Sequence, residues 1–399
     1  MHDNFTPPVA NRNYTYANIA AYECIAAGYP EEFQSLSGQL NGLKPMPQPE
    51  NTKSIDFEFA AVLAFCKVGV ELTFSESLLE KYVDSLKREA KQFGMPNATL
   101  KATEKFSTAI AQAILDWAKD DNYLQTRTAI KFNVTQEPGR WIPTPPMYAE
   151  AVEPAWNQIR PLVMDSANQI SAPPPFPYNV SDTSSAFYQE AVKLKRASET
   201  LTDDQRHMAD FWDDNPFKLN VVGHVMYSTK KFSPPGHWMG IAGIGGAAVQ
   251  ADFPKLVCAY AKTSIALFEA FIQCWNEKYE HSYVRPETVI NQHIDPEWRP
   301  YLQTPPFPEY TAGHTTTSAA AAAVLTEVFG DQIAFTDTTE LEFGIPSRSF
   351  TSFRHAAEEN IWARFYGGIH YYHTCEVSNK LGNEIGEFVS RKLIMNKLN

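Results

Sequence analysis

Apolar side chains in this chain recur at the spacing of an α-helix, and this periodicity constrains the fold more than any other feature. The run that begins at Ser75 has apolar residues three and four positions apart and stops at Gly94, two residues before a proline. The segment from Asp56 to Leu72 is apolar almost all round, which is typical of a buried helix. Strand-like alternation is scarce. We therefore predict an all-α fold built from helix bundles.

Further helices are indicated by their ends. Thr202 precedes two aspartates, as expected of a helix N-cap, and residues 254–278 form one long helical pattern. A second apolar stripe covers residues 106–117. Proline-rich stretches at 143–146, 173–177 and 305–308 are expected to be surface connections rather than domain boundaries. We therefore predict a single domain over residues 1–399.

The charge balance excludes several classes of partner. The chain has 34 Lys and Arg against 46 Asp and Glu, a net charge of −12. A nucleic-acid binder or a polybasic membrane-surface protein needs the opposite sign. We expect no apolar run to be long enough for a transmembrane segment. The five cysteines are scattered and include no CxxC pair, so a structural zinc site is not indicated.

The long helical pattern ends in a lysine that lies in line with an apolar face. Leu267, Phe271, Cys274 and Lys278 follow one another at intervals of four, three and four. Lys278 is either a helix-end lysine with its amine in water or a buried cation that needs an anion. Arg285 follows seven residues later, and the proline after it favours an extended backbone just past the helix.

Two further segments suggest an anion site. Gly313 and His314 open an alanine-rich helix, and free N–H groups at a helix N-terminus bind anions, although a Gly–His turn alone would look the same. Arg364 and His370 cannot share one helix face, but the Gly–Gly pair at 367–368 would break the helix and let them converge. Three cations, a helix N-terminus and two histidines in an acidic chain fit a tetrahedral oxyanion.

The complete set of motifs resembles a known signature. Lys278-x6-Arg285-Pro, Thr-Ala-Gly-His at 311–314 and Arg364-x5-His370 together resemble the pattern of vanadium-dependent haloperoxidases. The related type-2 phosphatidic acid phosphatases and bacterial acid phosphatases share that pattern. Within the group the chain is most similar to bacterial vanadium iodoperoxidases. The resemblance covers most of the chain and includes the stretches 14–23, 211–216 and 233–238.

The resemblance implies a cofactor, an activity and roles for residues between 270 and 375. The cofactor would be vanadate, and hydrogen peroxide would oxidise a halide, iodide before bromide, to hypohalous acid. His370 would bind vanadium, and His314 and Lys278 would be catalytic. Trp275 and Phe307 lie where the family has its halide pocket, although ordinary core packing would also explain them. The group that holds vanadate would comprise Lys278, Arg285, Ala312, Gly313, His314, Arg364 and His370.

The sequence departs from the family at two positions. Ala312 stands where the family usually has a serine, which indicates an introduced Ser→Ala substitution or natural divergence. Thr374 stands where the phosphatases have an aspartate that orients the histidine, which favours a haloperoxidase over the alternative, an acid phosphatase with a phosphohistidine at His370. A third alternative is a binding protein with a decayed site. Glu376 is the candidate carboxylate partner of His370.

Several expectations concern the surroundings and the location of the protein. His237 and Trp238 are candidates for a second layer around the site, and His373 is expected to be exposed rather than a ligand. The bacterial family members are generally exported, so the resemblance implies a periplasmic or secreted protein whose signal peptide has been removed. Nothing in the sequence indicates an assembly interface, and a monomer is slightly favoured.

Overall fold

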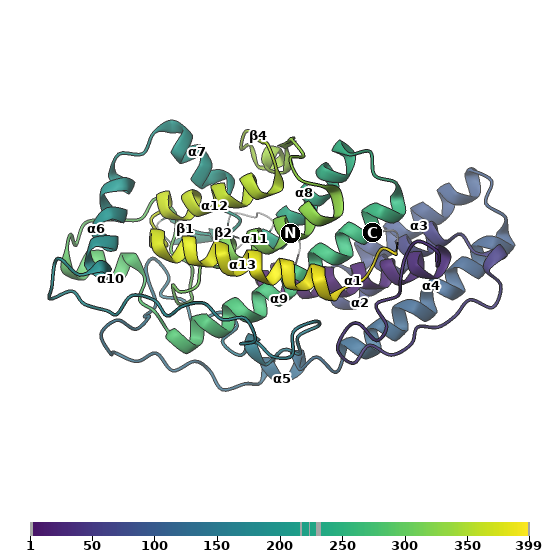
Figure 1. The fold of residues 1–399 in the computed structure, drawn as a ribbon, viewed down its shortest axis with the longest axis horizontal. Helices are drawn as coiled ribbons and strands as arrows, with labels where there is room; N and C mark the ends of the chain where they lie inside the picture. Colours follow the sequence, from purple (N-terminus) through teal and green to yellow (C-terminus); the bar gives the residue numbers. More distant parts are fainter. Residues whose placement is uncertain (1–2, 216–217, 223, 229–232, 398–399) are drawn as a thin grey trace.

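The computed structural model describes residues 3–215, 218–222, 224–228 and 233–397, and this part of the chain is mostly helical (Figure 1). The predicted all-α fold is confirmed, with short strands as a minor addition. The α-helices are α1 (Pro7–Gly28), α2 (Phe57–Leu72), α3 (Glu76–Gln92), α4 (Asn97–Ala118), α5 (Tyr123–Arg127), α6 (Ala186–Glu199), α7 (Asp203–Phe211), α8 (Pro234–Ala248), α9 (Phe253–His281), α10 (Pro286–His293), α11 (Gly313–Phe329), α12 (Phe353–Tyr366) and α13 (Tyr372–Lys392).

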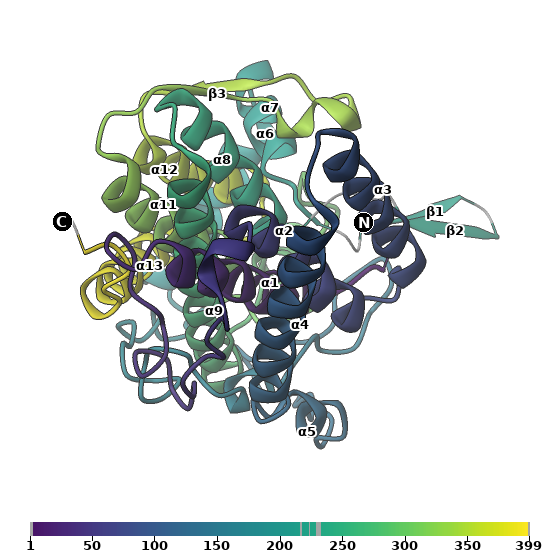
Figure 2. The same ribbon diagram turned by 90° about the vertical axis from the view of Figure 1, so that its right-hand side faces the viewer.

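The strands form two small antiparallel sheets of two strands each. β1 (Leu219–Val222) pairs with β2 (Val225–Ser228), and this hairpin projects from the body of the protein (Figure 2). β3 (Phe335–Asp337) pairs with β4 (Arg348–Phe350) in a register that places Asp337 opposite Arg348. Three short 3-10 helices, η1 (Thr52–Ser54), η2 (Trp156–Gln158) and η3 (Thr339–Phe343), complete the regular structure of the described residues.

Helix α9 lies at the centre of the bundle and packs against α1, α8, α11 and α13. It begins where the Asp252 side chain accepts a hydrogen bond from the Lys255 N–H, and it ends at Ser282, whose φ of 46° is left-handed. The helix predicted over 254–278 is therefore confirmed, with a few residues more at its C-terminus. The predicted face of Leu267, Phe271, Cys274 and Lys278 is buried throughout.

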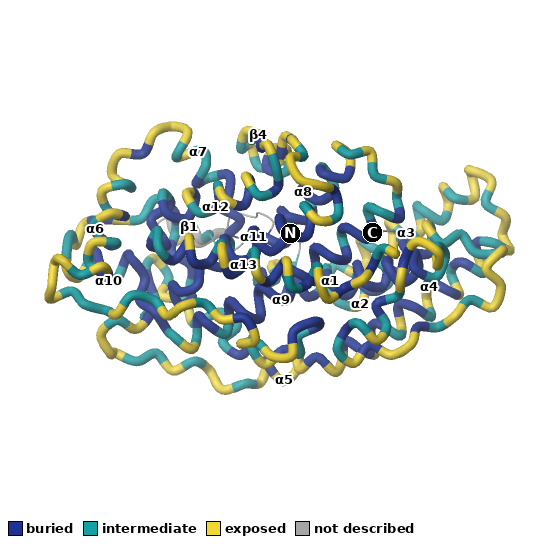
Figure 3. The backbone as a smooth tube through the Cα atoms, in the orientation of Figure 1, coloured by how far each residue is buried: buried dark blue, intermediate teal, exposed yellow. Residues whose placement is uncertain are grey.

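Within the described ranges, α9 is the one helix long and apolar enough to cross a membrane, with a mean hydropathy of 1.2 over its most apolar stretch. Judged by length and composition alone, the expectation that no apolar run is long enough for a transmembrane segment is therefore wrong. Other parts of the protein bury 89% of that stretch, which is how the core helix of a bundle is packed. Figure 3 shows this contrast between the buried central helices and the exposed periphery.

Helices α11 and α13 approach each other very closely. A side chain at Gly382 or Gly386 of α13 would collide with the backbone of α11 at Thr316 or Ala320. The alanine-rich sequence of α11 supplies the matching small surface. This close packing holds the N-terminus of α11 in place, and that terminus forms part of the site described below.

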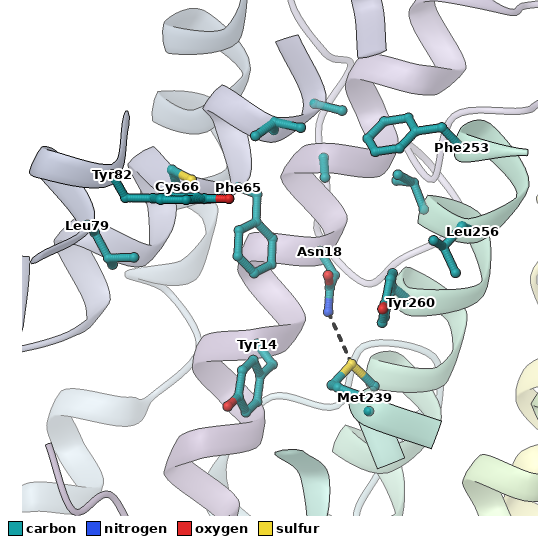
Figure 4. A pocket seen from close by; sticks show the side chains of 15 residues that line it. Tyr14, Asn18, Phe65, Cys66, Leu79, Tyr82, Met239, Phe253, Leu256 and Tyr260 are labelled. Carbon is teal, nitrogen blue, oxygen red and sulfur yellow. Dashed lines mark hydrogen bonds between the residues drawn. The ribbon is translucent and has the colours of Figure 1, made fainter. Parts of the chain in front are cut away.

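The other helices predicted from end signals are also present. Thr202 forms a capping box with Gln205 at the start of α7, and Ser75 is the N-cap of α3. Helix α3 is peripheral, however, and none of its residues is fully buried. Next to it, a cavity of about 490 Å³ opens between α1, α2, α3, α8 and α9, with Tyr14, Phe65 and Tyr260 in its wall (Figure 4).

Candidate active site

The sequence motifs converge because each lies at the end of a helix. Lys278 is in the last turn of α9, Arg285 is the N-cap of α10, and Gly313 begins α11. Arg364 is in the last turn of α12. The chain then turns at Gly368, where φ is +78° and a side chain would press against Pro300, and reaches His370. The predicted break of the helix at the Gly–Gly pair is confirmed.

Arg285 is the residue that joins two of the motifs directly. Its guanidinium is fully buried, and Nη1 donates to the Ile369 carbonyl at 2.9 Å and lies 3.1 Å from His370 Nε2. Nε donates to the Phe307 carbonyl at 2.9 Å. These bonds fix the plane of the guanidinium, while Nη2 has no partner among the described residues.

Lys278 is a buried cation rather than a helix-end lysine with its amine in water. Its Nζ donates to the carbonyls of Pro308, at 2.9 Å, and Glu309, at 3.2 Å, and also to that of Thr311. Burial lowers the pKa of Lys278 to about 7, and the nearby Arg285 contributes to this. An anion placed beside the amine would reverse the shift, because it would stabilise the charged form.

His370 is oriented by a carboxylate that the sequence reasoning did not identify. His370 Nδ1 lies 2.9 Å from Glu309 Oε1, and the Tyr371 N–H and the Thr374 hydroxyl donate to the same carboxylate, each at 3.0 Å. The candidate Glu376 is exposed, so that assignment is wrong. The threonine at 374 therefore does not imply an unoriented histidine, and it no longer separates a haloperoxidase from a phosphatase.

The protonation of His370 follows from this arrangement. Burial lowers the pKa of His370 well below its usual range, and Arg285, Lys278 and Arg364 lower it further. Burial also raises the pKa of Glu309 to about 7, although the cations oppose that change. With Nδ1 facing the carboxylate, a neutral imidazole presents the lone pair of Nε2 to the cluster, which is the state that binds a metal.

Arg364 and His314 complete the cluster. Arg364 Nη1 donates to the Trp212 carbonyl at 2.8 Å, whereas Nε is buried without a partner among the described residues. His314 Nε2 is likewise buried and without a partner there. Burial, followed by the charges of Arg364 and His237, lowers the pKa of His314 well below its usual range.

The start of α11 adds free backbone donors. Within the described part of the chain, no hydrogen bond is found from the N–H groups of Gly313, His314 or Thr315. Ala312, the N-cap, offers no side-chain acceptor, and its own N–H donates to the Ser378 hydroxyl at 2.8 Å. A buried polar atom without a partner costs free energy. Free donors from several directions therefore fit an anion of several oxygens, such as vanadate.

Trp275 and Phe307 border the cluster. Their ring centroids are 5.2 Å apart, and Lys278 Nζ lies 5.0 Å from the Phe307 ring and 5.9 Å from that of Trp275. Trp275 Nε1 donates to the Val152 carbonyl at 3.1 Å, which fixes the indole. Both rings therefore lie beside Lys278, and both residues also belong to the buried core.

The outer candidates lie in different surroundings. His237 is buried between Asp214 and Asp337, and Trp238 donates to the Ser318 hydroxyl at 2.8 Å. His373 is half-buried rather than exposed, because its ring stacks on Phe176 at 4.1 Å.

Comparisons with known proteins show which chains this one is similar to. A family model described as "VCPO second helical-bundle domain" matches residues 259–396. The crystal structure of the first bacterial vanadium-dependent iodoperoxidase is 46% identical, with a TM-score of 0.92, over 99% of this chain and 93% of that one. A holo-type bacterial vanadium-dependent chloroperoxidase is 17% identical, with a TM-score of 0.70 over 98% and 93% of the two chains. No curated protein matches.

Proposed function

The chain belongs to the vanadium-dependent haloperoxidases, and we propose that iodide is the halide it oxidises with hydrogen peroxide. The family follows from 46% identity to an iodoperoxidase over nearly the whole chain. Within that family the protein is an enzyme whose cofactor is vanadate and whose product is hypohalous acid. The observation that supports this function most directly is the set of buried donors on Arg285, Arg364 and the first turn of α11 that find no partner among the described residues.

We propose that one of the predicted residues binds the metal and that the others donate hydrogen bonds to the vanadate oxygens. His370 Nε2 would bind the metal, because Glu309 holds the ring on its Nδ1 side. The unpartnered Nη2 of Arg285 and Nε of Arg364 would donate to the oxygens, together with the Gly313 N–H. When bound, vanadate activates hydrogen peroxide for a two-electron oxidation without changing its own oxidation state.

Lys278 and His314 would carry the chemistry of the protein itself. The Lys278 amine, held by three carbonyls, is fixed in direction and would polarise the oxygen that a halide attacks. The His314 imidazole is neutral in the anion-free cluster, and its Nε2 would take and return a proton there. Trp275 and Phe307 would exclude water from the place where the halide approaches.

The decisive experiment compares the apo-protein with and without orthovanadate. Triiodide formation from iodide and hydrogen peroxide should appear only with vanadate, and bromide should react more slowly. Hydrolysis of an aryl phosphate is measured in parallel. Phosphate release that vanadate inhibits, without any halide oxidation, would refute the proposed function in favour of a phosphatase.

We also propose a single domain over residues 1–399, a monomer, and a periplasmic or secreted location. The largest core cluster supports the first, because it joins residues from α1 at one end of the chain to α13 at the other. The other two rest on the sequence and on the export of bacterial family members. Light scattering on the purified protein would test the monomer, and fractionation of the source cells would test the location.

A further inference from the structure

Arg364 owes its direction to a short segment that follows α7. The guanidinium is almost fully buried, and the bond that fixes it runs from Nη1 to the Trp212 carbonyl at 2.8 Å. The orientation of this carbonyl therefore decides where the free Nε of Arg364 points. Trp212 is the first residue after α7, so its carbonyl lies outside the helix and is not held in direction by helical hydrogen bonding.

His237 contacts this segment at two places. Its ring stacks on the Trp212 indole, with centroids 4.7 Å apart and planes 26° apart. Its Nδ1 lies 3.0 Å from both carboxylate oxygens of Asp214, two residues after Trp212. His237 itself is in the first turn of α8, so the segment after α7 is attached to α8 through one side chain.

The opposite edge of the ring is attached to a third element. His237 Nε2 lies 2.9 Å from Asp337 Oδ2 at the end of β3, and Asp337 Oδ1 accepts from the N–H and the hydroxyl of Thr339. All three members of the trio Asp214, His237 and Asp337 are buried. An ionised carboxylate can only accept a hydrogen bond, so opposite two ionised aspartates both ring nitrogens carry a proton and the ring is an imidazolium.

The pKa of His237 also indicates that the ring is doubly protonated. Burial by itself lowers the pKa of His237, but the two aspartates outweigh burial and raise the pKa to about 10. A doubly protonated ring cannot slide or flip without losing an ionic hydrogen bond in a buried place, which is costly. The ring is thus a rigid link between α8, β3 and the segment that carries the Trp212 carbonyl.

We propose that His237 is a positioning residue of the vanadate site, which orients Arg364 through Trp212. His237 acts through its ring, which stacks on Trp212 and spans the distance between Asp214 and Asp337. The inference rests on the proposed function only in taking vanadate as the anion that Arg364 meets.

The test separates the ring from the charges that surround it. His237→Gln alone leaves two buried carboxylates facing a neutral amide, so it should lose both stability and vanadate affinity. Adding Asp337→Asn restores the match: the new amides can bond to each other and to Asp214, and the trio keeps its single net negative charge. Only the aromatic ring is then missing.

Vanadate affinity of the apo-proteins is measured by equilibrium dialysis with orthovanadate, beside thermal unfolding of the same samples. We expect the double variant to recover most of the stability but to bind vanadate at least tenfold more weakly than the wild type. If affinity returns together with stability, His237 has only a structural role and the proposal is wrong. A wild type that binds no vanadate would instead refute the proposed function.

Two further variants keep the test decisive. Glu327→Gln breaks the Lys262–Glu327 pair, 2.6 Å apart on a distant part of α9 and α11, and should cost stability without changing vanadate affinity. An equal loss of affinity in this control would overturn the proposal. If the double variant does not fold, Trp212→Phe keeps the carbonyl but reduces the stacked ring, and affinity should fall at least threefold. Unchanged affinity in that variant would also overturn it.

Discussion

Replacing Ala312 by serine measures how much anion affinity depends on a hydroxyl at the start of α11. Ala312 is fully buried and is the N-cap of the helix, but it makes no side-chain cap. A serine hydroxyl has one proton to donate and two lone pairs to accept with. It can therefore accept from the free N–H of His314 or Thr315 and still donate to a vanadate oxygen.

The hydrogen bond from the helix N–H to the serine and the hydrogen bond from the serine to vanadate contribute different free energies. The first changes the stability of the protein, and the second changes its affinity for vanadate. The cap stabilises the helix by about 0.5–2 kcal/mol whether or not an anion is bound. The cost of fitting one more atom into a packed site, about 1–3 kcal/mol, is also common to both states. Only the bond to the anion, about 1.5–3 kcal/mol for a charged acceptor, changes the dissociation constant. At about 1.4 kcal/mol for each factor of ten, Ala312→Ser should bind vanadate about 10–150-fold more tightly.

Equilibrium dialysis of the apo-protein against orthovanadate gives this dissociation constant directly. Ala322→Ser is the matched control, because it places the same hydroxyl at a fully buried alanine of the same helix, away from its N-terminus. The control should change the thermal stability and leave the affinity alone. An Ala312→Ser affinity within threefold of the wild type would show that the hydroxyl does not reach the anion, and the reasoning would fail.

Three more predictions concern the cluster itself. The pKa of Lys278 is about 7 without an anion and must rise when an anion binds, so vanadate binding takes up a proton above pH 7. Vanadate affinity should therefore fall by up to about tenfold for each pH unit above 7. Lys278→Arg should flatten this pH dependence in the same dialysis, and an unchanged slope would contradict the prediction. Glu309→Gln keeps a hydrogen-bond acceptor for His370 Nδ1 but loses the charge, so vanadate affinity should drop about 10–100-fold, whereas an equal affinity would mean that the carboxylate orients nothing. His370→Ala should abolish vanadate-dependent triiodide formation while the thermal transition persists, and full retention of activity would exclude His370 as the metal ligand.

The helices were predictable because their signals are local. The capping box of Thr202, the stop at Gly94 and the long pattern of α9 all depend on residues within a few turns. The cations of the site were predictable for a different reason. A proline follows Arg285 and a glycine pair follows Arg364, whereas Lys278 ends the long apolar face of α9, and together the three cations resemble a specific signature.

The second layer of the site was not predictable in the same way. Glu309 reaches His370 across 61 positions of sequence, and Asp337 reaches His237 across 100. Glu309 directly follows the Pro-rich stretch 305–308, but nothing local distinguishes its carboxylate from a solvated one. Its burial is a consequence of tertiary packing, and only a pairing rule for the metal-binding histidine would have drawn attention to it.

All five cysteines are buried and unpaired, and burial raises the pKa of every one of their thiols. The thiolate is the form that oxidants attack most readily, and an enzyme that makes hypohalous acid is surrounded by its own oxidant. Keeping the thiols neutral and away from water therefore lengthens the working life of the catalyst. Cys66 lines the cavity between α1, α2, α3, α8 and α9 (Figure 4), so damage by the product should begin at this thiol.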